Sequence, residues 1–439
     1  MERKKWLDGL RGVAAAIVAF DHFFMTDVWH PFLSFWNERS GMNGRLVQLP
    51  PIRVLFSAHA MVTLFMVISG YAISINILNS RSNRSQFWTR LSSAIWRRGF
   101  RIYLPVLVIS AITQVLFFFG FFHWTFDENL LMGIEPWSHP WAHVKWLFTY
   151  MMDNMNIVTF QYRGGLNPQL WTMPIEFRGS YVVFLLIAGS ASWRPKLRLW
   201  VLPVLAVYFF WYGTWDVFGF IWGLWLAERT VAKEDEEEEK VSLQIPVPRS
   251  CNKLLRLVHL PQRKLPMSKI ITVFCFLAGF HLICLGNDGE LTPGYQFLAA
   301  FQPSAWKDNW ELIHWSWKAV GAAMLVHAIN ESPLLQRPFD TRFAQYLGHI
   351  SFSVYLLHEG IYELWRDPVR NFFWMLLNGS PYPGGPEAAA NDPFSFHLTW
   401  WMSGIMLGSV VVGLAHYYTI HVDQRCVAFT KKLEKLLTR

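Results

Sequence analysis

The first apolar stretch of the chain reads Leu7-Asp8-Gly9-Leu10-Arg11-Gly12 and continues Val13-Ala14-Ala15-Ala16-Ile17-Val18-Ala19-Phe20-Asp21-His22. Within it, Asp8, Arg11, Ala15, Val18 and His22 recur at steps of three and four, which is the spacing of one helical face. Arg11 and His22 therefore differ by only about 20° around the helix axis and by about 16 Å along it. An apolar helix with an ionisable stripe is typical of a membrane span that has a functional side.

The composition of the whole chain supports a membrane protein. Of 439 residues, 53% are hydrophobic and only 16% are charged, against about 25% charged in an ordinary soluble domain. The 24 Trp and 36 Phe residues suit helices that face lipid and aromatic belts at the membrane edges. The apolar runs extend over the full length, so we expect one all-α membrane domain, a helical bundle that occupies residues 1–439.

The apolar runs predict about ten transmembrane helices, because a span needs about 20 mostly apolar residues. The expected spans are 12–32, 54–78, 99–122, 170–190, 198–214, 216–230, 268–286, 312–330, 345–365 and 398–421. The Trp-rich stretch around 137–151 reads instead as an interfacial helix. With the N-terminus in the cytoplasm, the cytoplasmic segments hold most of the 39 Lys and Arg residues, which predicts an N-in, C-in topology.

One acidic run, Glu234-Asp235-Glu236-Glu237-Glu238-Glu239, falls in a predicted cytoplasmic segment. Dense like charge repels itself and resists packing. We therefore expect a flexible acidic cytoplasmic loop at about 231–266. A docking site for a partner is the alternative reading of this run.

His22 is the ionisable group of the first span that lies nearest the middle of the bilayer. A neutral imidazole in a dry pocket can act as a general base. Small or β-branched residues separate His22 from Arg11, which leaves room for a slender substrate or for a neighbouring helix. The alternative is a core histidine that forms a hydrogen bond to another helix.

A basic cluster stands at the cytoplasmic entrance of the third expected span. Arg97 and Arg101 are one helical turn apart, Arg98 lies between them, and Ile102-Tyr103-Leu104-Pro105 follows. Guanidinium groups bind phosphate bidentately, so the cluster suits a phosphorylated cytoplasmic ligand. Contact with lipid headgroups is the alternative reading.

Three further segments place polar groups within apolar spans. Ser69-Gly70-Tyr71 lies in the second span, and Glu176 follows Leu170-Trp171 and Pro174 in the fourth. Ser351, Tyr355 and His358 share one face of the ninth span. Glu176 could bond an acceptor hydroxyl, hold His22 in one tautomer, or pair with Arg178 or Lys318. Helix packing is the alternative for the other two segments.

Taken in order, these five segments resemble the acyltransferase-3 family of membrane O-acyltransferases, and several resemble its fungal branch. The opening Leu7–Gly12 with His22 is the most specific piece. The resemblance implies transfer of an acyl group, usually acetyl, from its coenzyme A thioester to a hydroxyl. It makes His22 catalytic with Arg11 and Asp8 beside it, and makes Arg97, Arg98 and Arg101 donor-binding residues. The expected substrate-binding residues are Ser69, Tyr71, Glu176, Tyr355 and His358.

The resemblance also fixes the expected partners. Acetyl-CoA or another acyl-CoA would be the donor, and a sugar, a lipid or a small metabolite, as in fungal secondary metabolism, would carry the acceptor hydroxyl. We expect the chain to lie in the endoplasmic reticulum or plasma membrane, with no metal and no nucleic-acid partner. The rival class is a transporter or permease for a small polar or amphipathic solute, in which Lys318, Glu176 and His358 would be coupling groups. A membrane scaffold or receptor is a third class.

Overall fold

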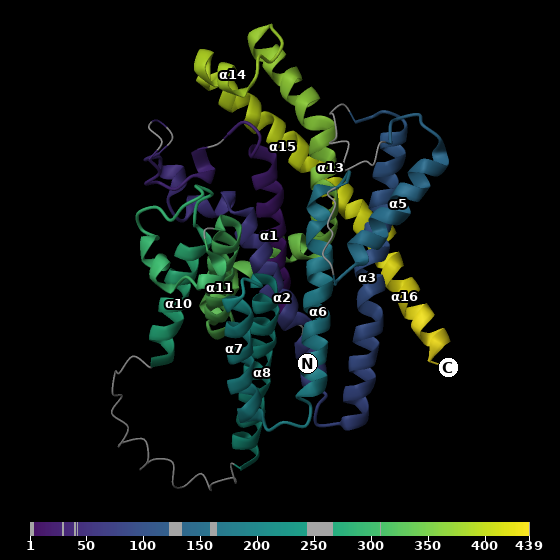
Figure 1. Cartoon of the computed structure of the whole chain (residues 1–439), viewed down its shortest axis with the longest axis vertical. Coiled ribbons are helices and arrows are strands. Elements are labelled where there is room, and N and C mark those ends of the chain that lie inside the picture. Colours follow the sequence, from purple (N-terminus) through teal and green to yellow (C-terminus); the bar gives the residue numbers. More distant parts are fainter. Residues whose placement is uncertain are drawn as a thin grey trace.

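The computed structural model of the chain describes residues 4–28, 30–38, 41, 43–122, 134–158, 165–243, 267–307 and 309–438, with the side chains of 238–243 excepted. Within these residues all regular structure is helical (Figure 1). The long helices are α1 (Lys5–Phe24), α2 (Ala58–Leu78), α3 (Arg84–Phe118), α6 (Thr172–Gly189), α7 (Pro195–Trp211), α8 (Trp215–Leu243), α10 (Met267–Ile283), α11 (Trp310–Glu331), α13 (Arg342–Asn378) and α15 (Pro393–Tyr418).

Shorter elements connect or flank these helices. The short α-helices are α5 (Pro140–Met155), α12 (Pro333–Gln336), α14 (Gly385–Asn391) and α16 (Gln424–Leu437). The 3₁₀ turns are η1 (His30–Phe32), η2 (Leu46–Gln48), η3 (Ile52–Phe56), η4 (Pro168–Trp171), η6 (Gln296–Phe301), η7 (Ser304–Trp306) and η8 (Arg337–Asp340). A π-helical turn, η9 (Thr419–Asp423), joins α15 to α16.

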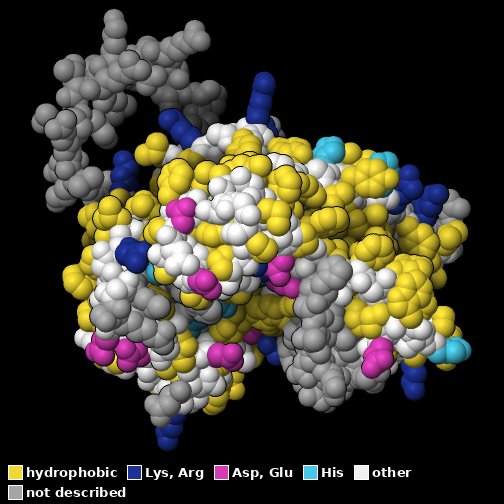
Figure 2. Space-filling view, turned by 90° about the horizontal axis from the view of Figure 1, so that it is seen from above, with side chains coloured by type: hydrophobic (Ala, Val, Ile, Leu, Met, Phe, Trp, Pro, Cys, Tyr) yellow, Lys and Arg dark blue, Asp and Glu magenta, His cyan; other side chains and the backbone are white. Residues whose placement is uncertain are grey.

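The helical membrane class predicted from the sequence is confirmed. In the part of the chain that the structure describes, four helical stretches are long and apolar enough to cross a membrane, namely Ala58–Leu78, Arg84–Phe118, Pro168–Gly189 and Pro393–Leu437. Each of the ten expected spans falls on one of the ten long helices. Seen from above, hydrophobic side chains extend to the edges of the molecule (Figure 2), where lipid would contact it.

Several helix boundaries differ from the expected ones. α1 ends at Phe24, eight residues before the expected limit, where the chain turns at 25–27. Pro31 follows in the short 3₁₀ turn η1 and has no amide hydrogen with which to continue an α-helix. α3 begins at Arg84, where the Asn83 side chain accepts a bond from the Gln86 amide. The arginine cluster therefore lies on the helix itself rather than before it.

α13 runs well past its expected end at 365. It continues through Arg366 and Pro368 to Asn378 and stops where Gly379 adopts a positive φ of 69°, a conformation that suits glycine. The charged residues that suggested an earlier end have partners. Arg366 donates to the His22 carbonyl at 3.0 Å, and Arg370 pairs with Asp27 at 2.7 Å.

The acidic run also differs from its expected state. α8 continues through Glu234–Glu239 to Leu243, so the first part of the expected 231–266 loop is helical, and residues 244–266 lie outside the described part. Lys4 forms an ion pair with Glu234 at 3.1 Å. A lysine partner for one carboxylate reduces the self-repulsion that led us to expect a loop.

The core is organised around α1 and α2, which pack against α13 and α8. Gly12 of α1 faces Gly348 of α13 so closely that a Cβ on Gly12 would lie 2.2 Å from the Gly348 nitrogen. Gly70 of α2 meets the Phe220 carbonyl of α8 in the same way, at 2.2 Å. Because glycine has no side chain, the helix backbones approach closely at these crossings, which is the usual basis of tight packing between membrane helices.

Candidate active site

The ionisable stripe of α1 faces α13, and the two helices run in the same direction. Arg11 donates through Nε to Ser351 Oγ at 3.1 Å and through Nη2 to the Gly348 carbonyl at 3.2 Å. Asp8 lies one turn earlier, with its Oδ1 at 3.6 Å from Arg11 Nη2. One partner helix, α13, therefore holds the predicted catalytic residues Asp8, Arg11 and His22.

His22 meets two side chains of α13 at the outer end of this stripe. Its Nδ1 is 3.0 Å from His358 Nε2 and 3.1 Å from Glu359 Oε2. The two α13 groups lie 3.7 Å apart. His358 is fully buried, whereas the side chains of His22 and Glu359 retain 23% and 14% of their exposure.

The hydrogen-bond partners define the tautomer of His22. His358 Nδ1 is 3.1 Å from the Val354 carbonyl, which accepts only, so Nδ1 carries the proton and Nε2 of a neutral His358 is an acceptor. The Glu359 carboxylate is also an acceptor. His22 Nδ1 faces two acceptors and must therefore donate, which leaves a lone pair on His22 Nε2. An imidazole with a free Nε2 and a carboxylate at Nδ1 is the arrangement of a general base.

Glu359 is a site residue that we did not predict, although it is ionisable and lies in an expected span. The signal was present in the dipeptide His358-Glu359. Adjacent helical residues point about 100° apart, and we therefore placed only His358 on the helical face that carries Ser351 and Tyr355. Since a Glu side chain is long and flexible, it reaches His22 from the next position.

His22, His358 and Glu359 could also hold a metal ion. Among the described residues, their ligand atoms form a group that lies within 4.8 Å of one another. Two imidazoles and one carboxylate are a common ligand set for Zn²⁺. The prediction that the site needs no metal stays a prediction, and the same atoms form a complete hydrogen-bonded trio without one.

A cavity of about 1070 Å³ opens on the predicted cytoplasmic side of His22, His358 and Glu359, which we call the His22 trio. Its basic lining residues are Lys4, Arg11, Arg90, Arg97, Arg98, Arg101 and Lys431, and its carboxylates are Asp8, Glu176 and Asp423. Seven basic side chains against three acidic ones give the lining an excess of positive charge, which suits an anionic ligand. All three arginines predicted to bind the donor are part of it.

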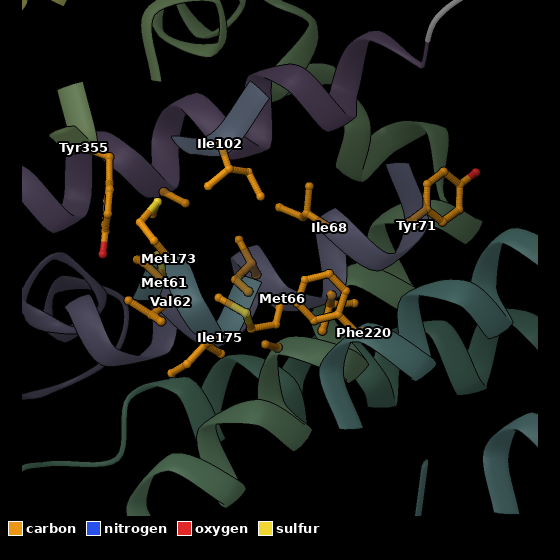
Figure 3. Close-up of a cluster of buried hydrophobic side chains, with 14 of the residues drawn as sticks. Met61, Val62, Met66, Ile68, Tyr71, Ile102, Met173, Ile175, Phe220 and Tyr355 are labelled. Carbon is orange, nitrogen blue, oxygen red and sulfur yellow. The ribbon is translucent and has the colours of Figure 1, made fainter. Parts of the chain in front are cut away.

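The far end of the cavity is mostly apolar and reaches α13. Val62, Thr172, Met173 and Tyr355 line it, and Figure 3 shows Tyr355 and Tyr71 on opposite sides of the surrounding buried cluster. The Tyr355 hydroxyl bonds the Thr172 hydroxyl and the Gln169 carbonyl, each at 2.7 Å. The rings of Tyr355 and His358 are 5.8 Å apart. The cavity thus ends one helical turn from the His22 trio.

Arg98 and Glu176 form a second polar group in the cavity wall. Arg98 Nη2 pairs with Glu176 Oε1 at 2.6 Å, and the same oxygen accepts from Ser69 Oγ at 3.1 Å. Glu176 therefore contacts none of the three side-chain partners proposed from the sequence. Arg178 instead pairs with Asp216 at 2.5 Å.

The predicted substrate-binding residues occupy different places. Ser69, Glu176 and Tyr355 line the cavity, as does part of Tyr71. The Tyr71 ring is buried and its hydroxyl donates to Thr230 Oγ1 at 3.3 Å. His358 lies beyond the cavity, against His22. The structure brings these residues to one region, and their roles stay predictions.

Comparison with known proteins gives this arrangement a class. Residues 4–230 match the profile of the acyltransferase-3 family, an acyltransferase domain. Together with the apolar helices, this match defines a membrane acyltransferase. The match covers more than half of the chain, and the chain belongs to the acyltransferase-3 family. It includes α1, α2, α3 and α6, whereas α13 lies outside it.

Three fungal proteins are similar over much of their length. The O-acetyltransferase PaAT-1 of Phomopsis amygdali is 28% identical over 95% of this chain and 83% of its own. The acyltransferases clz18 of Cochliobolus lunatus and R4 of a Phoma species are each 22% identical, over 72% of this chain and 70% of theirs. No solved structure matches the chain.

Proposed function

We propose that this protein transfers an acyl group, most simply acetyl, from acyl-CoA to a hydroxyl of a sugar, a lipid or a small metabolite. The family and the relatives named as acyltransferases support the reaction class. The printed activity of PaAT-1, an O-acetyltransferase, supports a hydroxyl acceptor and an acetyl donor. The fungal sources of all three relatives suit an acceptor from secondary metabolism.

One observation carries the proposal. The cavity has a basic end and an apolar end, and its apolar end stops one turn of α13 from His22. Along α2 its lining extends from Val62 to Ile77, which is about 22 Å of helix. Such a shape suits a ligand with phosphates at one end and a slender chain at the other, as acyl-CoA has.

The reaction then divides between the two ends. The arginines hold the phosphates, while the pantetheine arm runs along the Arg11–His22 face toward Tyr355. His22 Nε2 takes the proton of the acceptor hydroxyl as its oxygen attacks the thioester carbonyl. The C–S bond breaks, and the proton passes from the imidazolium to the departing thiolate. Glu359 offsets the positive charge that His22 carries between these two steps.

The acceptor would approach His22 from another side. His22 and Glu359 keep part of their exposure, yet neither lines the donor cavity. The exposed edge of the imidazole therefore opens away from that cavity. In the ten-span, N-in, C-in topology that we propose, this places donor and acceptor on opposite sides of His22.

A transfer assay tests the proposal. Membranes with wild-type protein, His22→Ala or His416→Ala receive labelled acetyl-CoA and an extract of host lipids and metabolites. His416→Ala is the matched control, because this histidine is also in a long apolar helix but is exposed. We expect a labelled product other than acetate with wild type and control, and a loss of about 10²-fold or more with His22→Ala. Undiminished transfer by His22→Ala would contradict the proposed mechanism. Solute uptake without any labelled product would favour a transporter.

A further inference from the structure

The C-terminal helix α16 lies against the arginine-bearing half of α3, at the basic end of the cavity. The two helices are neighbours in Figure 1, where α16 descends beside α3 at the right. Val427, Thr430 and Lys431 of α16 are part of the cavity lining. α16 contains none of the predicted site residues, and the family match ends nearly two hundred residues before it.

Two contacts attach α16 to the cavity wall. Thr430 is only 2% exposed, so this face of the helix is packed. One turn later, Glu434 Oε2 lies 3.4 Å from Arg97 Nε. Arg97 also donates to the Ser93 carbonyl. The ion pair lies directly beside the predicted phosphate-binding arginines, so the position of α16 and the geometry of Arg97 depend on each other.

Glu434 and Lys431 have opposite effects on the charge of the cavity. Glu434 offsets part of the charge of Arg97, which is one of the predicted donor-binding residues. Lys431 restores a positive charge on the same side, on a flexible side chain with three donors. Its side chain is exposed, which leaves the ammonium group accessible to a ligand that enters the cavity.

We propose that α16 forms one wall of the nucleotide end of the donor site and that Lys431 binds a phosphate group of coenzyme A. This inference rests on the proposed function and adds to it a C-terminal element. A phosphate monoester carries about −1.5 to −2 charges at neutral pH, and an ammonium group binds it as a compact point charge. The phosphate meets cations from both sides, from α3 and from α16.

Binding of coenzyme A to purified full-length protein tests the inference by calorimetry. The variants are Lys431→Ala, Lys431→Arg and the control Lys432→Ala, whose side chain is also exposed but does not line the cavity. We expect Kd to rise about tenfold for Lys431→Ala, to stay near the wild-type value for Lys432→Ala, and to recover for Lys431→Arg. Equal thermal stability of the four proteins would exclude a folding defect.

A second ligand identifies the phosphate. If Lys431 binds the 3′-phosphate, Lys431→Ala will lose the preference of wild type for coenzyme A over its 3′-dephospho form. If it binds the diphosphate, both ligands will weaken by the same factor. Wild-type binding of coenzyme A that Lys431→Ala leaves unchanged would overturn the inference while the proposed function stands. Failure of the wild-type protein to bind coenzyme A would instead overturn the proposed function itself.

Discussion

At the residue scale, the chemistry depends on which nitrogen of His22 carries a proton. Glu359 and His358 both offer acceptors to Nδ1, at 3.1 and 3.0 Å, and the carboxylate is the stronger acceptor because it is charged. Glu359 thereby holds His22 in the tautomer with a free Nε2. Replacement by an amide of the same shape could present an N–H to Nδ1 and reverse that tautomer.

We therefore expect Glu359→Gln to lower kcat by about 10²-fold while KM for the donor stays unchanged, because Glu359 does not line the donor cavity. Steady-state kinetics with acetyl-CoA would measure both constants. Glu363→Gln, one turn further along α13, is the matched control and should keep near wild-type kcat. A rise in KM with normal kcat for Glu359→Gln would mean that Glu359 binds substrate rather than positioning His22.

A second prediction concerns a metal ion at His22, His358 and Glu359. Because His22 Nδ1 already has acceptors at hydrogen-bond distance, the trio is complete without an ion. We expect purified enzyme treated with EDTA and then freed of the chelator to retain its full rate of acyl transfer. Lost activity that Zn²⁺ restores would contradict this, since a metal bound to Nδ1 would replace the proton on which the general-base argument depends.

Much of this residue-scale arrangement was predictable. The stripe from Asp8 to His22 is local, so helical periodicity alone places its members on one face. The stripe of Ser351, Tyr355 and His358 is predictable for the same reason. What periodicity cannot give is the pairing of stripes that lie more than 300 residues apart. The bond that Arg11 donates to Ser351 follows from that pairing. The bond that Arg98 donates to Glu176, 78 residues away, also follows from tertiary packing and could not be read from spacing.

At the element scale, the position of His22 depends on how closely α1 approaches α13. The contact between Gly12 and Gly348 leaves no room for a methyl group, because a Cβ on Gly12 would overlap the backbone of α13. Neither backbone can move without shifting the Arg11 and His22 contacts above and below the crossing.

Gly12→Ala should therefore destabilise the protein by about 1–3 kcal/mol, even though alanine is the better helix former. Thermal unfolding in detergent should show a lower Tm than wild type. Gly413→Ala in α15 is the control, because a Cβ there meets nothing within 4 Å, and its Tm should match or slightly exceed that of wild type. Equal Tm values for all three proteins would show that the crossing is looser than described.

Element boundaries were the least predictable feature at this scale. Apolar runs locate the spans, but they do not reveal where a helix continues into polar sequence. α3, α8 and α13 all extend beyond the apolar stretch, because charged residues in these extensions find partners. The ion pairs are Arg97 with Glu434 (3.4 Å), Glu234 with Lys4 (3.1 Å) and Arg370 with Asp27 (2.7 Å). α16 is amphipathic rather than apolar, so hydrophobic length alone does not predict it.

At the scale of the whole molecule, the proposed function requires the basic end of the cavity to face the compartment that contains acyl-CoA. Arg90, Arg97 and Lys431 mark this end, and the N-in, C-in topology that we propose would place it in the cytoplasm. The first half of α13 lines the cavity, and the helix then leads away from the basic end. Its 37 residues correspond to about 55 Å of helix, against roughly 30 Å of hydrocarbon, so its last turns with Asn378 should project beyond the outer face.

Glycosylation in microsomes tests this orientation, because an Asn-x-Ser sequon is modified only on the lumenal side. Asn378-Gly379-Ser380 is a sequon, but Pro381 follows it directly, whereas Asn83-Arg84-Ser85 begins the basic helix α3. We expect Pro381→Ala to acquire one glycan that an added Asn378→Gln removes, with no glycan on Asn83. A glycan on Asn83 would invert the molecule and turn the basic mouth of the cavity away from cytoplasmic acyl-CoA. That result would contradict the proposed roles of Arg97, Arg101 and Lys431 in donor binding, because all three roles require the basic end of the cavity to face the cytoplasm.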